Sequence, residues 1–161
     1  MKVWLPALLL VSLFLGSCKD GAAPAASALD ELDLMSHGLP IKIKAPTGAK
    51  VVADDMGFIK DVTVKGEGNY FLQILGSEMT TTDLSAVVNS QKEDAKNSPF
   101  FSEIVSEDEN GFIFKKQITP DRTNYDFRSV KIQGDQEYVF QMGMMGSFSL
   151  DEVKTMYAAV K

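Results

Sequence analysis

The chain contains one cysteine and one histidine, and these two side chains limit the chemistry it can perform. Cys18 supplies the only thiol, whose thiolate is a good nucleophile. His37 supplies the only imidazole, so one copy of the chain cannot build a histidine-rich metal site or a histidine-based triad of the usual kind. Its Met-Ser-His-Gly setting, just before an expected strand, is typical of a surface histidine. The sequence therefore predicts neither a catalytic role nor a metal for His37.

The most unusual local feature is a cluster of three methionines at positions 142, 144 and 145, which we call the Met142–Met145 segment. One glycine lies within the segment and another follows it. Thioethers bind Cu(I), so these side chains could form a soft site together with Met35 and His37. In the alternative interpretation, Met142 and Met144 share one strand face with aromatic residues and pack beneath the last helix. We expect packing, and a Met-based copper-binding envelope protein remains an alternative function.

Acidic and glycine-rich segments give weaker candidates. Glu103 and the run Glu107–Glu109 flank an expected hairpin, but they lack the ligand spacing of an EF-hand loop, so we expect a solvated turn. Gly66 and Gly68 fall between two expected strands, whereas a phosphate-binding loop would need a helix to follow. Paired carboxylates suited to glycoside cleavage depend on distances in space, so a hydrolase of that kind also remains an alternative.

The residues before the cysteine predict a secretory signal. A lysine follows the initiator methionine, and the run Val3–Leu15 is then almost wholly apolar. At about 1.5 Å per residue this run spans about 20 Å, short of the roughly 30 Å hydrocarbon core of a bilayer. A charged start, a short apolar stretch and small residues before a cleavage site are typical of a signal peptide rather than of a membrane span.

The segment Leu15-Gly16-Ser17-Cys18 resembles the bacterial lipobox, in which an aliphatic residue and two small residues precede a cysteine. The resemblance implies cleavage between Ser17 and Cys18, a diacylglyceryl group on the Cys18 thiol and, usually, acylation of the new amine. An ordinary signal peptide with a chance cysteine is the alternative. In the sorting rule of such lipoproteins, Lys19 in place of aspartate favours the outer membrane over the inner membrane. A Cys-Lys-Asp start also resembles signals for display on the cell surface in some Gram-negative groups.

The composition limits the classes of partner that the mature chain is expected to bind. Cleavage removes Lys2 from the 16 basic residues and leaves all 22 acidic ones, so the mature side chains carry a net charge of about −7. This charge disfavours nucleic acid and direct electrostatic adhesion to anionic lipid. One cysteine allows no disulfide within the chain, so an apolar core must hold the fold. We expect a membrane contact through the lipid, and an envelope protein or small ligand as partner.

The order of expected elements predicts a signal peptide at residues 1–17, a flexible tether at 18–31 and a single α+β domain at 32–161. The tether is rich in alanine and contains glycine, proline and serine, which cannot form a core. Apolar and polar residues alternate in the strands that we expect at 39–44 and 61–65, and Val51-Val52 is expected to form a short strand. The run at 70–75 is apolar on both faces, so we expect it to be a central strand of the sheet.

A helix is expected from about residue 82 to 97, with Leu84, Val87, Val88, Gln91 and Ala95 on its inner face. Four strand-like runs joined by short turns then predict an antiparallel meander, at residues 101–106, 112–117, 125–132 and 137–144. A Ser-Leu-Asp-Glu capping box at 149–152 opens a last helix that ends near residue 160.

These elements predict an antiparallel sheet covered by two helices, an α+β sandwich. The order of elements over residues 39–161, with its closing Ser-Leu-Asp-Glu-Val-Lys helix, resembles the PsbP-like fold. Proteins of that fold are mostly non-enzymatic binding or assembly factors, and the resemblance carries no site residue to this chain. We therefore expect a lipid-anchored envelope protein that is not an enzyme, needs no cofactor and binds a protein or small ligand.

Overall fold

The computed structural model describes residues 28–161. The expected signal peptide, Cys18 and the tether up to residue 27 lie outside this range. Among the described helices, none is both long enough and apolar enough to span a bilayer. The elements are β1 (Leu29–Asp33), the 3-10 helix η1 (Met35–His37), β2 (Lys42–Pro46), β3 (Lys50–Asp55), β4 (Ile59–Lys65), β5 (Phe71–Glu78), α1 (Leu84–Lys96), β6 (Phe101–Asp108), β7 (Gly111–Thr119), β8 (Arg122–Gln133), β9 (Gln136–Met142) and α2 (Leu150–Ala159).

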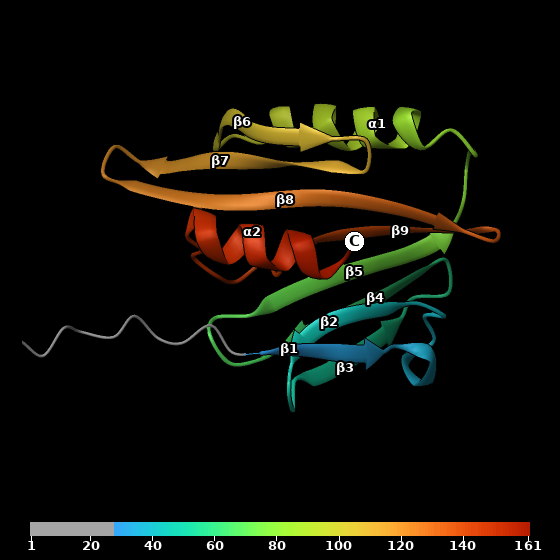
Figure 1. Cartoon of the computed structure of the whole chain (residues 1–161). Helices are drawn as coiled ribbons and strands as arrows, with labels where there is room; N and C mark the ends of the chain where they lie inside the picture. The colour runs from blue at the N-terminus through green and yellow to red at the C-terminus, as the bar shows by residue number, and fades with distance from the viewer. Residues whose placement is uncertain (1–27) are drawn as a thin grey trace, which may run out of the picture.

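Seven strands form one antiparallel sheet in the order β3-β4-β5-β9-β8-β7-β6, and β1 pairs with β2 in a separate two-stranded sheet (Figure 1). Strands β6 to β9 follow one another across the sheet, which confirms the predicted meander. The last strand, β9, lies between β8 and β5 and so joins the two halves of the sheet. The predicted α+β class, an antiparallel sheet with two helices, is thus confirmed.

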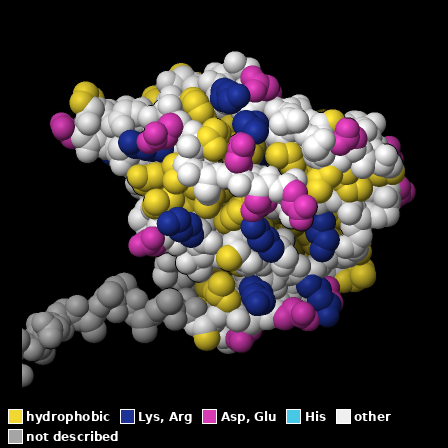
Figure 2. Space-filling view, turned by 45° about the horizontal axis from the view of Figure 1, so that its top comes forward, with side chains coloured by type: hydrophobic (Ala, Val, Ile, Leu, Met, Phe, Trp, Pro, Cys, Tyr) yellow, Lys and Arg dark blue, Asp and Glu magenta, His cyan; other side chains and the backbone are white. Residues whose placement is uncertain are grey.

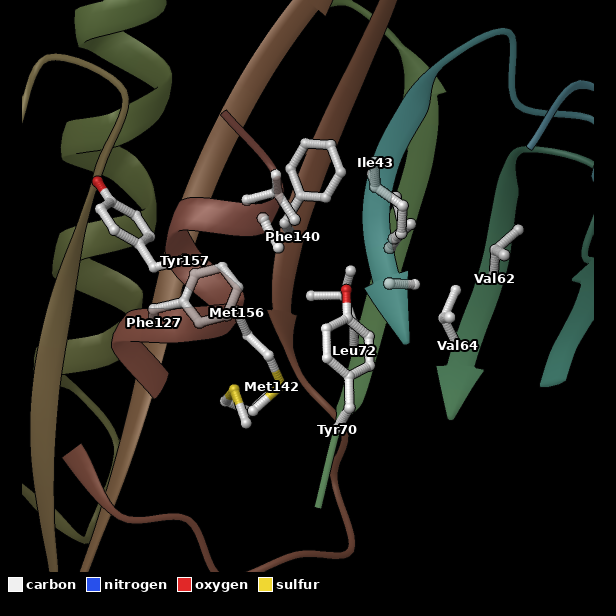
Figure 3. Packing of buried hydrophobic residues seen from close by; sticks show 14 of the residues in the cluster. Ile43, Val62, Val64, Tyr70, Leu72, Phe127, Phe140, Met142, Met156 and Tyr157 are labelled. Atoms are coloured by element: carbon white, nitrogen blue, oxygen red, sulfur yellow. The ribbon is translucent and has the colours of Figure 1, made fainter. Parts of the chain in front are cut away.

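The helices cover opposite faces of the sheet because successive side chains of a strand point to opposite sides. Helix α1 packs on a cluster that includes Phe112, Phe114 and Val130. Helix α2 and the β1–β2 sheet pack on the other face, over the larger core cluster. Figure 3 shows this core, in which aromatic rings and sulfur-containing side chains from β8, β9, α2 and the residue before β5 meet aliphatic side chains of β2, β4 and β5: Phe127, Phe140, Met142, Met156, Tyr157, Tyr70, Ile43, Val62, Val64 and Leu72.

Side-chain hydrogen bonds cap the start of both helices, and the cap of α2 is the one that the sequence predicts. The Asp83 side chain caps α1 by accepting a hydrogen bond from the Ala86 amide at 3.2 Å. The capping box of α2 is present, because Ser149 and Glu152 each accept a hydrogen bond from the other's backbone N–H. Three residues of the expected inner face of α1 are buried, namely Val87, Val88 and Ala95.

Several expected boundaries differ from the structure, and three of these differences matter for the site. The folded domain begins at Leu29 rather than at residue 32, because Leu29 pairs with Pro46 and packs against the larger core cluster. Strand β2 lies at 42–46 instead of 39–44, because the amides of Leu39 and Ile41 donate to the carbonyls of Leu34 and Leu39 rather than to a neighbouring strand. Strand β9 ends at Met142, so the expectation that Met144 packs beneath the last helix is wrong: Met144 is 84% exposed.

Candidate functional site

A groove with a cavity volume of about 710 Å³ opens at one end of the sheet, where η1, the β3–β4 turn, the end of β5 and the start of β9 meet. We call it the distal groove. It is lined by side chains from four separate segments of the chain, among them Phe58, Ile59, Lys60, Glu78, Gln136 and Tyr138. The groove is open to solvent and is larger than three other hollows in residues 28–161, whose volumes are about 340, 220 and 310 Å³.

The β3–β4 turn presents large apolar side chains to solvent beside the groove. Phe58 is 76% exposed and Met56 is 57% exposed. The turn is nevertheless well ordered by hydrogen bonds: the Met56 amide donates to the Ile59 carbonyl at 2.9 Å, and the Gly57 amide donates to the Asp55 carboxylate at 2.8 Å. Gly57 has a φ of +85°, which favours glycine. The turn is therefore a fixed platform for an exposed aromatic ring.

Lysine and tyrosine side chains shape the inner wall of the groove. Lys60 Nζ donates to the Gly38 carbonyl at 3.2 Å and so joins the β3–β4 turn to the end of η1. Tyr138 is 1% exposed, and its Oη has no hydrogen-bond partner among the described residues. Burial, with a contribution from the Asp135 carboxylate, raises the pKa of Tyr138. The wall is therefore neutral at Tyr138 and cationic at Lys60.

Acidic side chains stand around the rim. Glu78, at the end of β5, lines the groove and is exposed. Asp55, the last residue of β3, and Asp135, in the β8–β9 turn, are also exposed, and each lies within two residues in sequence of a residue that lines the groove. The main chain holds two of these segments together, since the Met79 amide donates to the Asp135 carbonyl at 2.9 Å. An apolar surface inside an acidic rim is suited to an apolar group flanked by positive charge.

A second hollow, of about 310 Å³, lies near the start of β8 and the end of β9. Its buried carboxylate, Asp126, is fully engaged: it accepts hydrogen bonds from Lys116 Nζ at 2.8 Å, Arg128 at 3.1 Å and the backbone amides of Phe127 at 2.8 Å and Met142 at 3.2 Å. A carboxylate that accepts four hydrogen bonds, two of them from cationic side chains, is poorly placed to act as base or nucleophile. We therefore assign these charges to the fold.

The methionines and the histidine are not brought together. Met35 and His37 belong to η1, which ends at Gly38 in the distal groove beside the Glu78 end of β5. The Met142–Met145 segment lies at the Phe71 end, where the Gly143 amide donates to the Phe71 carbonyl at 2.9 Å. Strand β5 has 8 residues, so its ends are about 23 Å apart. A copper site built from both sets is therefore wrong.

The remaining sequence candidates have ordinary surroundings. The acidic run Glu107–Glu109 is exposed, as expected of a solvated turn, and Glu107 pairs with Lys92 at 2.8 Å. Gly66 and Gly68 form the turn between β4 and β5, which confirms that expectation. Among the described residues, no three histidine, cysteine, aspartate or glutamate side chains gather as a metal site would require.

Sequence reasoning missed the residues of the distal groove. The signal that could have found them is the turn Asp-Asp-Met-Gly-Phe at 54–58, in which two large apolar residues occupy positions that are usually polar. Figure 2 shows a face of the molecule on which basic and acidic side chains are interspersed, with exposed apolar side chains in small groups between them.

No protein-family model matches this chain, and neither the curated proteins nor the solved structures contain a significant match to it. The PsbP-like resemblance and the lipobox resemblance therefore stay predictions from the sequence. The candidate site rests on its geometry alone.

Proposed function

We propose that the chain is a lipoprotein of the bacterial envelope, anchored by acyl chains on Cys18, whose folded domain binds a partner protein through the distal groove and performs no catalysis. The outer membrane is its expected location, and display on the cell surface follows from the Cys-Lys-Asp start. The single observation that carries the binding role is the ordered turn that holds Phe58, 76% exposed, over the groove.

Physical chemistry supports the anchor. A single acyl chain binds a membrane only marginally, whereas two or more hold a protein there durably. The lipobox implies at least two chains on Cys18, so this residue can retain a domain whose own charge disfavours anionic lipid. Replacement of Cys18 by alanine should move the protein from the membrane fraction to the soluble fraction. Unchanged fractionation, or a free thiol at residue 18 in the mass of the native protein, would refute the anchor.

The position of the groove supports a role in binding something away from the membrane. Strand β1 runs from Leu29, the end nearest Cys18 along the chain, to η1 beside the groove. Figure 1 shows the start of β1 and η1 at opposite ends of the domain. The groove thus faces away from the point at which the anchored segment joins the domain.

The lining chemistry defines the partner. Phe58 and Ile59 line the groove and offer apolar contact. The exposed carboxylate of Glu78 in the lining, and those of Asp55 and Asp135 within two residues of the lining in sequence, attract basic side chains. An exposed aromatic residue on a fixed turn can anchor an interface at little entropic cost. We therefore propose a protein segment in which an apolar side chain is flanked by lysine or arginine.

The test places a photoreactive benzoylphenylalanine at residue 58 in the lipidated protein in living cells. The matched control places it at Phe100, another exposed phenylalanine, which lies in the connection between α1 and β6. We expect one predominant protein adduct from residue 58 and none from residue 100.

Charge reversal then tests the rim. Glu78→Lys should reduce the adduct from residue 58 several-fold, because it repels a basic segment, whereas Glu109→Lys on the exposed β6–β7 turn should leave it unchanged. Equal adducts from residues 58 and 100, or an adduct insensitive to Glu78→Lys, would remove the groove from the proposal.

A further inference from the structure

Met144 and Met145 are held in solvent on an ordered loop between β9 and α2. They are 84% and 88% exposed, the highest values among the large apolar side chains of the described residues. The loop cannot fold them away, because Asn124 donates to the Gly146 carbonyl at 3.1 Å and accepts from the Phe148 amide at 2.6 Å. Two adjacent apolar side chains on a fixed loop are suited to contact another apolar phase.

The loop lies at the end of the domain where the anchored segment enters. Leu29 pairs with Pro46 across β1 and β2. Pro46 lies so close to Gly66 that a Cβ atom added at Gly66 would lie 2.8 Å from the proline ring. The β4–β5 turn leads from Gly66 to Phe71, and the Phe71 carbonyl accepts from the Gly143 amide. Contacts thus run without a break from the start of β1 to the methionine loop.

Chain length keeps this end near the bilayer. Even a fully extended chain from Cys18 to Leu29 reaches at most about 40 Å. The proposed acyl chains on Cys18 therefore confine Leu29, and the loop beside it, to the neighbourhood of the membrane. Lys50 and Lys65 pair across β3 and β4 at the same end, and their charges suit anionic headgroups.

We infer that Met144 and Met145 insert into the outer part of the bilayer that carries the anchor, an inference that rests on the proposed lipidation of Cys18. The anchor keeps the loop at a high local concentration beside the bilayer, and insertion of the two side chains fixes the orientation of the domain. The loop lies at the Phe71 end of β5 and the distal groove at the Glu78 end. Insertion of the loop therefore directs the groove away from the membrane.

Methionine oxidation tests the inference without any change to the loop. The lipidated protein is bound to vesicles of phosphatidylethanolamine and phosphatidylglycerol and treated with chloramine-T, a charged oxidant that converts exposed methionine to the sulfoxide. The Cys18→Ala protein in solution is the reference. Met35 and Met56, 63% and 57% exposed, are internal controls in the same molecule. Mass spectrometry of peptides gives the oxidation rate at each site.

We expect the rate at Met144 and Met145, relative to Met35 and Met56, to fall at least about five-fold on vesicles, since the acyl region excludes a charged oxidant. An unchanged ratio for protein that floats with the vesicles would overturn the inference and leave the anchor standing. Protein that does not float would overturn both. Protection in native envelopes but not on pure vesicles would assign the loop to a protein contact and so also overturn insertion.

Discussion

Two buried tyrosines differ in a single hydrogen bond. Tyr70 Oη donates to the Lys44 carbonyl at 2.8 Å, whereas Tyr138 Oη is buried without a partner among residues 28–161. A typical hydrogen bond contributes about 1 kcal/mol net, and an unpaired buried hydroxyl costs free energy. We expect Tyr70→Phe to lower the free energy of unfolding by about 1 kcal/mol and Tyr138→Phe to leave it unchanged or raise it by about 1 kcal/mol. Urea unfolding of the Cys18→Ala protein measures both.

The two tyrosine-to-phenylalanine variants also test one oxygen atom at the groove, the hydroxyl of Tyr138. The tyrosines share the same chemistry and burial, so each is the control for the other. A loss of about 1 kcal/mol or more in Tyr138→Phe would contradict the assignment, because it would mean that the Tyr138 hydroxyl makes a stabilising hydrogen bond. Asp126, by contrast, already has four partners, which is why we place no reactivity there.

At the scale of elements, the capping box of α2 gives the second stability prediction. Ser149→Ala removes the hydroxyl that accepts from the Glu152 amide and should cost about 1 kcal/mol at neutral pH. Thr155→Ala on the exposed face of the same helix is the control, and it should change stability by less than about 0.5 kcal/mol. Thermal or urea unfolding measures the pair, and equal effects would contradict the role of the cap.

Glu152 makes the same box dependent on pH. Burial alone would raise the pKa of Glu152, but hydrogen bonds from Ser149 and Asn69 outweigh it and lower the pKa below its usual 4.5. Because its pKa is lower in the folded state, the Glu152 carboxylate contributes stability to the fold above pH 4.5. This contribution is lost as the pH falls through the pKa of the folded state. The loss on acidification should be smaller in Glu152→Gln, which cannot lose this carboxylate charge.

Helices and strands in which apolar residues recur at a regular spacing were predictable from the sequence, and elements without such a pattern were not. The inner face of α1 follows the helical repeat, and the meander follows from short polar turns between apolar runs. Strand β1 was missed because Leu-Asp-Glu-Leu-Asp is mostly charged and is ordered by its pairing with β2. The distal groove was missed because four segments meet there, and sequence spacing does not report such a meeting.

At the scale of the whole molecule, the domain has two ends with different surfaces. One end carries the start of β1 and the exposed methionine loop, and the other carries η1, the exposed turn at Phe58 and the groove. The strands of the sheet run between these ends (Figure 1). With the proposed anchor at one end and the proposed binding surface at the other, one small domain would be held at a membrane and still reach a partner.

This arrangement works only if both halves of the sheet behave as one body, and β9 is the strand that joins them. Phe140 in β9 is 1% exposed and pairs with Ile74 of β5 and Ser129 of β8. Phe140→Ala should cost about 3–5 kcal/mol. Because the strand contacts both halves, amide hydrogen exchange should accelerate together in β4 and β7.

Ile104→Ala is the matched truncation at the edge strand β6, where the side chain is only partly buried against the smaller cluster. We expect a loss below about 2 kcal/mol there, with faster exchange confined to β6 and α1. If Phe140→Ala accelerated exchange in only one half of the sheet, the two halves would be separate folding units. The tether end could then no longer fix the direction of the groove, because orientation is transmitted only through a rigid sheet.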